Sequence, residues 1–182
     1  MPVIFGYGSL INPRSAEKTL GRSLCSNELS CTTLPDHLRS WTARDCIKLK
    51  AGDQIRPCEA LFLDLTASPG SSCGGVAIQV CERELRMLDT RENAYERCAV
   101  ELMCSEGKLI QAFAYMMPES EKIHQGIILA RYKQIIDDAL SEYPESFARR
   151  FWQDTAPTAS QVVEGEYIFE HVGQNKAAGR SL

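Results

Sequence analysis

The alternation of apolar and polar positions predicts a strand-rich first part of the chain. Short apolar runs that are bounded by turn-forming residues are typical of strands buried on one or both faces. Residues 51–53 (Ala-Gly-Asp) and 68–72 (Ser-Pro-Gly-Ser-Ser) are turn formers and are expected to be loops. The strands that this pattern predicts cover residues 3–9, 24–34, 38–48, 59–66 and 75–81.

The sequence also predicts several helices and one hairpin. Asn12-Pro13 is a typical helix start, because Asn caps the first turn and proline needs no N–H there, and it predicts a helix over 13–20. Apolar residues recur three and four positions apart in the second half of the chain. The pattern predicts helices at 82–92, 125–141 and 144–153, and a hairpin whose strands, 95–104 and 109–117, flank a turn at 105–108.

The order of these elements predicts an α+β fold. Most strands precede most helices, which favours a mixed, largely antiparallel, barrel-like sheet with flanking helices over a doubly wound parallel sheet. Residues 1–155 are expected to form the main domain and residues 156–182 a C-terminal extension. Within that extension, residues 161–172 are expected to add one strand, and Gly173–Leu182 is expected to be a flexible tail.

Composition narrows the class of protein. The chain has 182 residues, of which 44% are hydrophobic and 24% charged, and its formal charge is −4. This argues against a nucleic-acid or membrane-surface binder, which usually carries a basic patch. No apolar run of about 18 residues predicts a membrane span, and the N-terminus lacks a signal-peptide pattern, so a cytoplasmic location is expected.

Cysteine and histidine give no metal signal. The eight cysteines include no C-x-x-C pair, and the three histidines stand at no ligand spacing. We therefore expect no metal and interpret the cysteines mostly as buried or incidental thiols.

The segment Phe5-Gly6-Tyr7-Gly8-Ser9-Leu10 is the first candidate for binding chemistry. Two glycines at a strand end allow a ligand to approach the backbone closely, and successive free N–H groups in such a turn can bind an anion. The dinucleotide, phosphate-loop and serine-elbow patterns all fail here. An ordinary tight turn explains the segment equally well.

Glu92 is the candidate for proton transfer. On a helix, Leu85, Leu88 and Glu92 share one face, so Glu92 is expected to point toward the same interior as the two leucines. A carboxyl group there must be paired, hydrogen-bonded or raised in pKa, and a raised pKa suits a general base near neutral pH. The alternative is the solvated end of a charged helix.

Tyr115 is a third candidate. Alternation along 109–117 places Phe113 and Tyr115 on one face, and a buried tyrosine hydroxyl needs a hydrogen-bond partner. A ligand could be that partner, and so could the surrounding backbone.

The order of these motifs resembles the γ-glutamyl cyclotransferase superfamily, which includes AIG2-like proteins. The start Phe-Gly-Tyr-Gly-Ser-Leu-Ile is followed about 80 residues later by Asp-x-Arg-Glu-x-x-Tyr, then by Ala-Phe-Ala-Tyr. The resemblance covers roughly residues 3–150. It implies that Tyr7, Gly8, Ser9 and Leu10 hold the γ-glutamyl group, that Glu92 is catalytic and that Tyr115 orients Glu92 or the substrate.

The activity that this resemblance implies is intramolecular aminolysis without a cofactor. A γ-glutamyl compound (glutathione, a γ-glutamyl-amino acid or a γ-glutamyl amine) would become 5-oxoproline plus a released amine. Arg91 is expected to lie at the surface or to support the site from behind, since helix neighbours point about 100° apart. The alternatives are a non-catalytic module that binds such a ligand and a related acyl-transfer enzyme.

Overall fold

The computed structural model of the chain describes residues 1–25, 27–104 and 106–179. The strands are β1 (Val3–Gly6), β2 (Ser30–Ala51), β3 (Gln54–Gln79), β4 (Glu96–Met103), β5 (Leu109–Met116), β6 (Ile127–Leu129), β7 (Gln161–Val163) and β8 (Glu166–Phe169). The helices are α1 (Pro13–Leu20), α2 (Glu82–Arg91), α3 (Ala130–Leu140), α4 (Glu145–Gln153) and α5 (Val172–Ala178), with short 3-10 turns η1 (Ser9–Ile11) and η2 (Glu119–Glu121).

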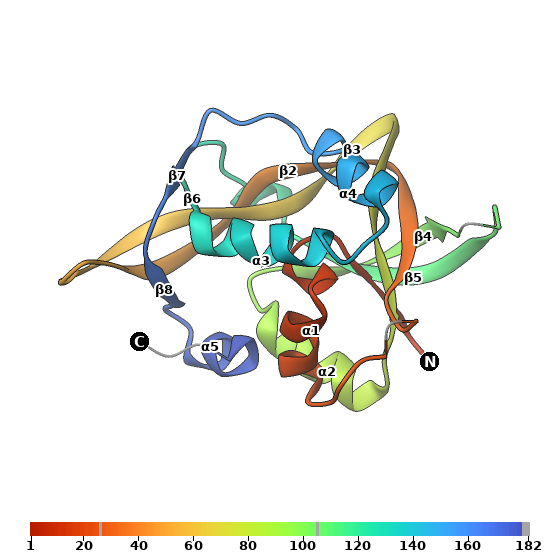
Figure 1. Cartoon of the computed structure of the whole chain (residues 1–182), viewed down its shortest axis with the longest axis horizontal. Helices are drawn as coiled ribbons and strands as arrows, with labels where there is room; N and C mark the ends of the chain where they lie inside the picture. The colour runs from red at the N-terminus through yellow and green to blue at the C-terminus, as the bar shows by residue number, and fades with distance from the viewer. Residues whose placement is uncertain (26, 105, 180–182) are drawn as a thin grey trace.

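Five of the strands close into a barrel in the order β3-β1-β5-β4-β2, because β2 also pairs with β3. β1 and β5 run parallel, and the other barrel pairs are antiparallel. β6 and β7 extend the sheet beyond β3, and β8 pairs with the end of β2 (Figure 1). The prediction of a mixed, largely antiparallel, barrel-like sheet is confirmed.

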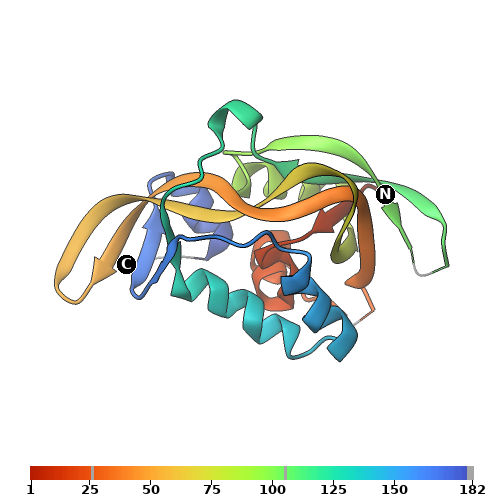
Figure 2. The ribbon, with the colours of Figure 1, turned by 90° about the horizontal axis from the view of Figure 1, so that it is seen from above.

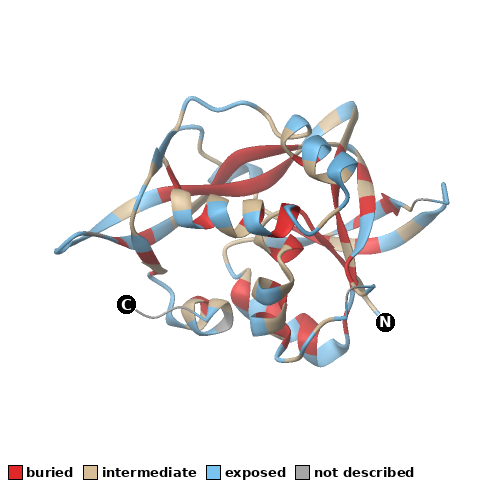
Figure 3. Cartoon of the chain, in the orientation of Figure 1, coloured by how far each residue is buried: buried red, intermediate tan, exposed pale blue. Residues whose placement is uncertain are grey.

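The helices flank this barrel in two groups. α3 and α4 lie along one side of the sheet (Figure 2). α1, α2 and α5 pack against one another below α3 in the view of Figure 1. The buried core follows the middle of β2 and β3 and the inner faces of the helices (Figure 3). The far ends of the β2–β3 and β4–β5 hairpins are exposed.

β2 and β3 differ from the sequence expectation, because each replaces two shorter predicted strands. Residues 68–72 were expected to form a loop between two strands but lie within the bounds of β3, so the strand does not end there; residues 68–71 nevertheless have no pairing partner on β2 and Gly70 has a φ of 81°, so they form a local bulge. Register shifts between Pro35 and His37 and between Trp41 and Ala43 bend β2 without ending it. Residues 24, 25 and 27–29, expected to be part of a strand, precede β2, and residue 26 lies outside the described residues. The turn after Ala51 is confirmed, with Gly52 at φ 62°.

The second half of the chain shows three further differences. Residues 127–129, expected at the start of a helix, form β6 instead, and the helix begins at Ala130. The single strand expected over 161–172 is two strands, β7 and β8. The flexible tail expected from Gly173 onward is wrong for residues 173–178, which belong to α5 (Val172–Ala178), a helix capped by the His171 side chain; residues 180–182 lie outside the described residues.

Candidate active site

A cavity of about 810 Å³ opens between the barrel and the helices α1, α2, α3 and α5. Its walls combine side chains from the turn after β1, the end of α2, the start of α3 and the C-terminal segment. Each candidate site residue from the sequence lines this one cavity: Tyr7, Gly8, Ser9, Leu10, Glu92 and Tyr115. The fold therefore brings together three motifs that are far apart in the sequence.

The turn after β1 places backbone N–H groups at the cavity. Gly8 caps η1 without a side-chain hydrogen bond, and the Ile11 N–H donates to the Gly8 carbonyl at 3.0 Å. Ser9 and Leu10 are the first residues of this short turn, so their N–H groups have no hydrogen-bond acceptor within it. Glycine is needed at position 8 because a Cβ atom there would lie 2.7 Å from the Tyr132 hydroxyl.

A buried arginine holds this turn from beneath. Arg39 is fully buried, and its Nε donates to the Tyr7 carbonyl at 2.8 Å. The same guanidinium also donates to the Gly74 carbonyl and lies 3.5 Å from the centre of the Phe151 ring. Sequence reasoning missed Arg39, since nothing in a strand pattern marks a charged residue as buried.

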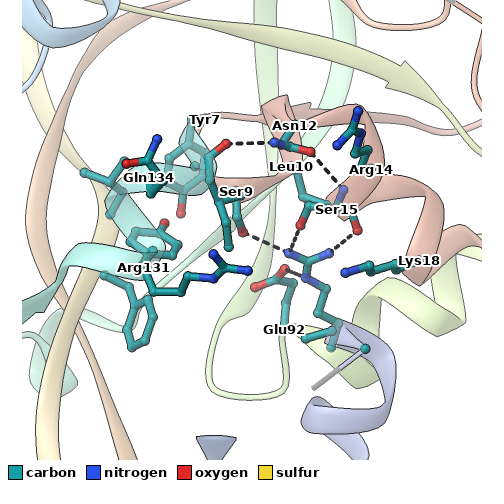
Figure 4. Close-up of a pocket in the computed structure, with 18 of the residues that line it drawn as sticks. Tyr7, Ser9, Leu10, Asn12, Arg14, Ser15, Lys18, Glu92, Arg131 and Gln134 are labelled. Carbon is teal, nitrogen blue, oxygen red and sulfur yellow. Dashed lines mark hydrogen bonds and ion pairs between the residues drawn. The ribbon is translucent and has the colours of Figure 1, made fainter. Parts of the chain in front are cut away.

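Glu92 is the residue directly after α2, its C-cap, and it lines the cavity. Its side chain is 16% exposed, and it pairs with the Nε of Arg91 at 3.0 Å (Figure 4). Burial raises the pKa of the Glu92 carboxyl above its ordinary value, and the Arg91 charge opposes that rise. Leu85 and Leu88 are buried on the same face of α2, as their spacing predicts.

Arg91 is not at the surface, so that part of the sequence expectation is wrong. Its side chain is 8% exposed and lies between α1 and the turn after β1. It donates to the Ser9 hydroxyl at 2.8 Å and to the Ser15 hydroxyl at 3.0 Å. It therefore supports the site from within, and the alternative of a solvated helix end does not apply.

Tyr115 reaches the cavity, but its hydroxyl points elsewhere. The hydroxyl donates to Asp89 Oδ1 at 2.7 Å, and Asp89 also accepts from Arg97 at 2.9 Å. The Tyr115 backbone carbonyl accepts the Tyr7 hydroxyl. Tyr115 thus fixes Tyr7 through its backbone, and the hydroxyl bond to Asp89 replaces the expected contact with Glu92.

Several lining residues were not singled out from the sequence. Asp45 of β2 accepts from the Gln174 side chain of α5 at 2.8 Å, and burial raises the pKa of the Asp45 carboxyl. Tyr95 and Tyr132 add two more hydroxyl-bearing rings, and burial raises the pKa of each. The Asp-x-Arg-Glu-x-x-Tyr motif contains Tyr95, so the signal for that residue was present in the sequence.

The C-terminal extension takes part in the site. Tyr167 and Phe169 of β8 line the cavity beside Phe62, with ring centres 6.1 and 5.7 Å from it. Gln174 of α5 is almost fully buried against Asp45. The residues after 155 therefore close one end of the cavity and do not stand apart from it.

Among the described residues, no group of three or more His, Cys, Asp or Glu side chains could hold a metal ion. In the same part of the chain, no helix is long and apolar enough to cross a membrane.

Most of the chain matches one known protein family. Residues 4–134, more than two-thirds of the chain, match the family described as "Gamma-glutamyl cyclotransferase, AIG2-like". The chain belongs to this family. The match ends within α3, so β7, β8 and α5 lie beyond it. No curated protein sequence matches the chain.

Solved structures share the fold at low sequence identity. A structure named "Gamma-glutamyl cyclotransferase" is 18% identical, with a TM-score of 0.62 over 89% of this chain and 93% of that one. The uncharacterized protein loc79017 from Homo sapiens is 19% identical, with a TM-score of 0.62 over 90% and 93%. YkqA from Bacillus subtilis is 16% identical, with a TM-score of 0.56 over 84% of this chain and 53% of YkqA. These likenesses establish the fold.

Proposed function

We propose that this family member is a γ-glutamyl cyclotransferase that converts a γ-glutamyl compound to 5-oxoproline and releases an amine. The observation that carries the proposal is Glu92, a largely buried carboxyl that lines a partly open cavity together with the turn after β1. Family membership supports the reaction class, and the cavity supports a small-molecule substrate.

The reaction would form a ring within one molecule. The α-nitrogen of the γ-glutamyl group attacks the γ-carbonyl carbon, the new C–N bond closes a five-membered lactam, and the bond to the leaving nitrogen breaks. When both amines are charged, the attacking nitrogen loses two protons and the leaving nitrogen gains two. No external nucleophile takes part and the reacting atoms are already in one molecule, so the protein contributes by holding the chain in the near-attack conformation, an effect that can amount to several kcal/mol.

Glu92 is suited to carry those protons. A base accepts a proton best when its pKa lies near the working pH, and burial moves the Glu92 pKa toward neutrality. Arg91 opposes this shift and so favours the carboxylate form, which is the form that accepts a proton from the attacking nitrogen. The same carboxyl group can then donate to the leaving nitrogen.

The turn after β1 would hold the charged and polar parts of the γ-glutamyl group. N–H groups at Ser9 and Leu10 can donate to the substrate α-carboxylate or to the oxygen that gains charge during attack. Gly8 lets the Tyr132 hydroxyl pack directly against this turn, because a Cβ atom at position 8 would lie 2.7 Å from that hydroxyl.

A 5-oxoproline assay tests the proposal. Wild type and Glu92→Gln would be incubated with glutathione, γ-glutamyl-amino acids and γ-glutamyl amines. We expect wild type to release 5-oxoproline from at least one class and Glu92→Gln to lose turnover by ~100-fold or more while it keeps its fold. Full turnover by a folded Glu92→Gln would refute the assignment of the base.

The same panel separates the alternative of a non-catalytic binding module. Calorimetric binding without product would favour that module, and neither binding nor product would mean that the fold is shared without the activity.

The eight cysteines are all free thiols, which supports the further proposal of a reducing, cytoplasmic location.

A further inference from the structure

The Arg91 guanidinium joins three parts of the site. Its Nε contacts Glu92 Oε1 at 3.0 Å, and one terminal nitrogen donates to the hydroxyls of Ser9 at 2.8 Å and Ser15 at 3.0 Å. The other terminal nitrogen donates to the Thr19 hydroxyl at 2.5 Å and to the Ser15 carbonyl at 3.0 Å. All three nitrogens of the guanidinium are thus engaged by groups from α1, the turn after β1 and the residue after α2.

The planar shape of the guanidinium makes this arrangement rigid. Its donors point in fixed directions, so a group bonded at one edge is placed relative to a group bonded at the other. With Oε1 of Glu92 engaged by Nε, the second carboxylate oxygen is left for the cavity. A lysine could keep the charge but could not hold Glu92 and Ser9 at fixed angles.

We propose that Arg91 is a positioning residue that, through its ion pair with Glu92 and its bond to the Ser9 hydroxyl, sets the orientation of the Glu92 carboxylate against the Ser9 turn. Its catalytic meaning rests on the proposed function. Its electrostatic effect on Glu92 does not, and can be measured without a substrate.

Other groups also face Glu92. Asp45 of β2 opposes its ionisation, and the hydroxyl-bearing rings of Tyr7, Tyr95 and Tyr132 surround the same space. Lys18 of α1 and Arg131 of α3 extend toward this space from opposite sides (Figure 4), and both are exposed. Arg91 is the cation paired with Glu92 among the described residues, so its loss should change Glu92 more than the loss of any of these.

The test uses Arg91→Met, Arg91→Lys and a matched control, Arg83→Met, which makes the same change at an exposed position of α2. The first readout is the titration midpoint of the Glu92 carboxyl, followed by carbon-13 NMR of protein labelled at the glutamate δ-carbon. The signal is assigned by its absence in Glu92→Gln. The second readout is the pH profile of kcat and kcat/KM for 5-oxoproline release, with thermal melting to verify folding.

We expect the Glu92 midpoint to rise by about one pH unit or more in Arg91→Met and to stay unchanged in Arg83→Met. Near pH 7, kcat/KM should fall ~10-fold or more, and raising the pH should restore only part of it, since orientation is also lost. In Arg91→Lys the midpoint should stay close to that of wild type while kcat falls ~10-fold, with KM nearly unchanged.

Three results would overturn the proposal. The first is an unmoved Glu92 midpoint in a folded Arg91→Met. The second is wild-type kcat in Arg91→Lys, which decides the matter alone if Arg91→Met does not fold. The third is full recovery of kcat/KM in Arg91→Met at high pH, which would mean that Arg91 acts through its charge alone and does not position Glu92. A wild type that releases no 5-oxoproline, while the midpoint still shifts in Arg91→Met, would instead refute the proposed function and keep the electrostatic role.

Discussion

Gly8→Ala tests whether the turn after β1 must stay free of side chains. A Cβ atom at position 8 would lie 2.7 Å from the Tyr132 hydroxyl oxygen, where an ordinary contact is 3.4–4 Å. The next atom, Leu63 Cβ, is 3.8 Å away and needs no movement. The perturbation is therefore a clash with one atom.

The magnitude follows from how firmly Tyr132 is held. Its ring is 6% exposed and packs edge-on against Phe62 at 4.9 Å and Trp41 at 6.1 Å. The hydroxyl must retreat by about 0.7 Å into this packed environment, and overpacking of this kind costs about 1–3 kcal/mol. For a domain of this length the melting temperature should fall by roughly 2–10 °C.

A double-mutant cycle with Tyr132→Phe identifies the source of this cost. The free energy of unfolding would be measured by urea denaturation for wild type, both single variants and the double variant. Because phenylalanine lacks the clashing oxygen, Gly8→Ala should cost about 1–2 kcal/mol less in that background. Equal costs in the two backgrounds would refute the reasoning, and so would a Gly8→Ala variant as stable as wild type.

Three further changes probe the walls of the site. Asp45→Asn should be more stable than wild type at pH 7. Burial raises the pKa of the Asp45 carboxyl, so its charged form destabilises the folded state at pH 7. Below about pH 4 the carboxyl is neutral in the folded and the unfolded state, and the stability difference between Asp45→Asn and wild type should vanish. Equal urea midpoints for the two proteins at pH 7 as well as at low pH would contradict this prediction. Arg39→Leu leaves the carbonyls of Tyr7 and Gly74 without their buried donor, so the free energy of unfolding should fall by about 3 kcal/mol or more. An unchanged urea midpoint would contradict this prediction. Gln174→Leu removes the 2.8 Å bond to Asp45 and should raise KM for the γ-glutamyl substrate by ~3–10-fold, with an unaltered KM as the contrary result.

The elements that the sequence predicts well have strong local signals. Asn12 accepts from the Ser15 N–H at 3.1 Å with Pro13 in the first turn, as the Asn-Pro pair predicts for α1. The hairpin of β4 and β5 has alternating apolar positions on both sides of its turn, and it is confirmed. In these places the local preference and the tertiary structure agree.

The long strands and the C-terminal segment depend on partners that no local pattern reveals. Pro69 and Gly70 predict a loop, and Gly70 does adopt a φ of 81° within residues 68–71, which have no pairing partner on β2; the pairing of β2 with β3 on both sides of this bulge continues the strand past it. Residues 166–169 pair with β2 far away in the chain, and that pairing brings the polar α5 into position over the cavity. Long-range contacts of this kind stabilise segments whose own sequences are weak predictors.

Arg91 shows where the physical reasoning from helix periodicity failed. The 100° rule separates neighbouring side chains only while both residues are helical. Glu92 is the C-cap of α2 with φ −94° and ψ 33°, so its side chain leaves the helical direction and meets the Arg91 guanidinium at 3.0 Å. The same spacing that marks Leu88 as buried also reaches Arg91, three positions later, on the inner face. A charged residue at the end of a buried helical face should therefore be considered an internal partner of the carboxyl group beside it.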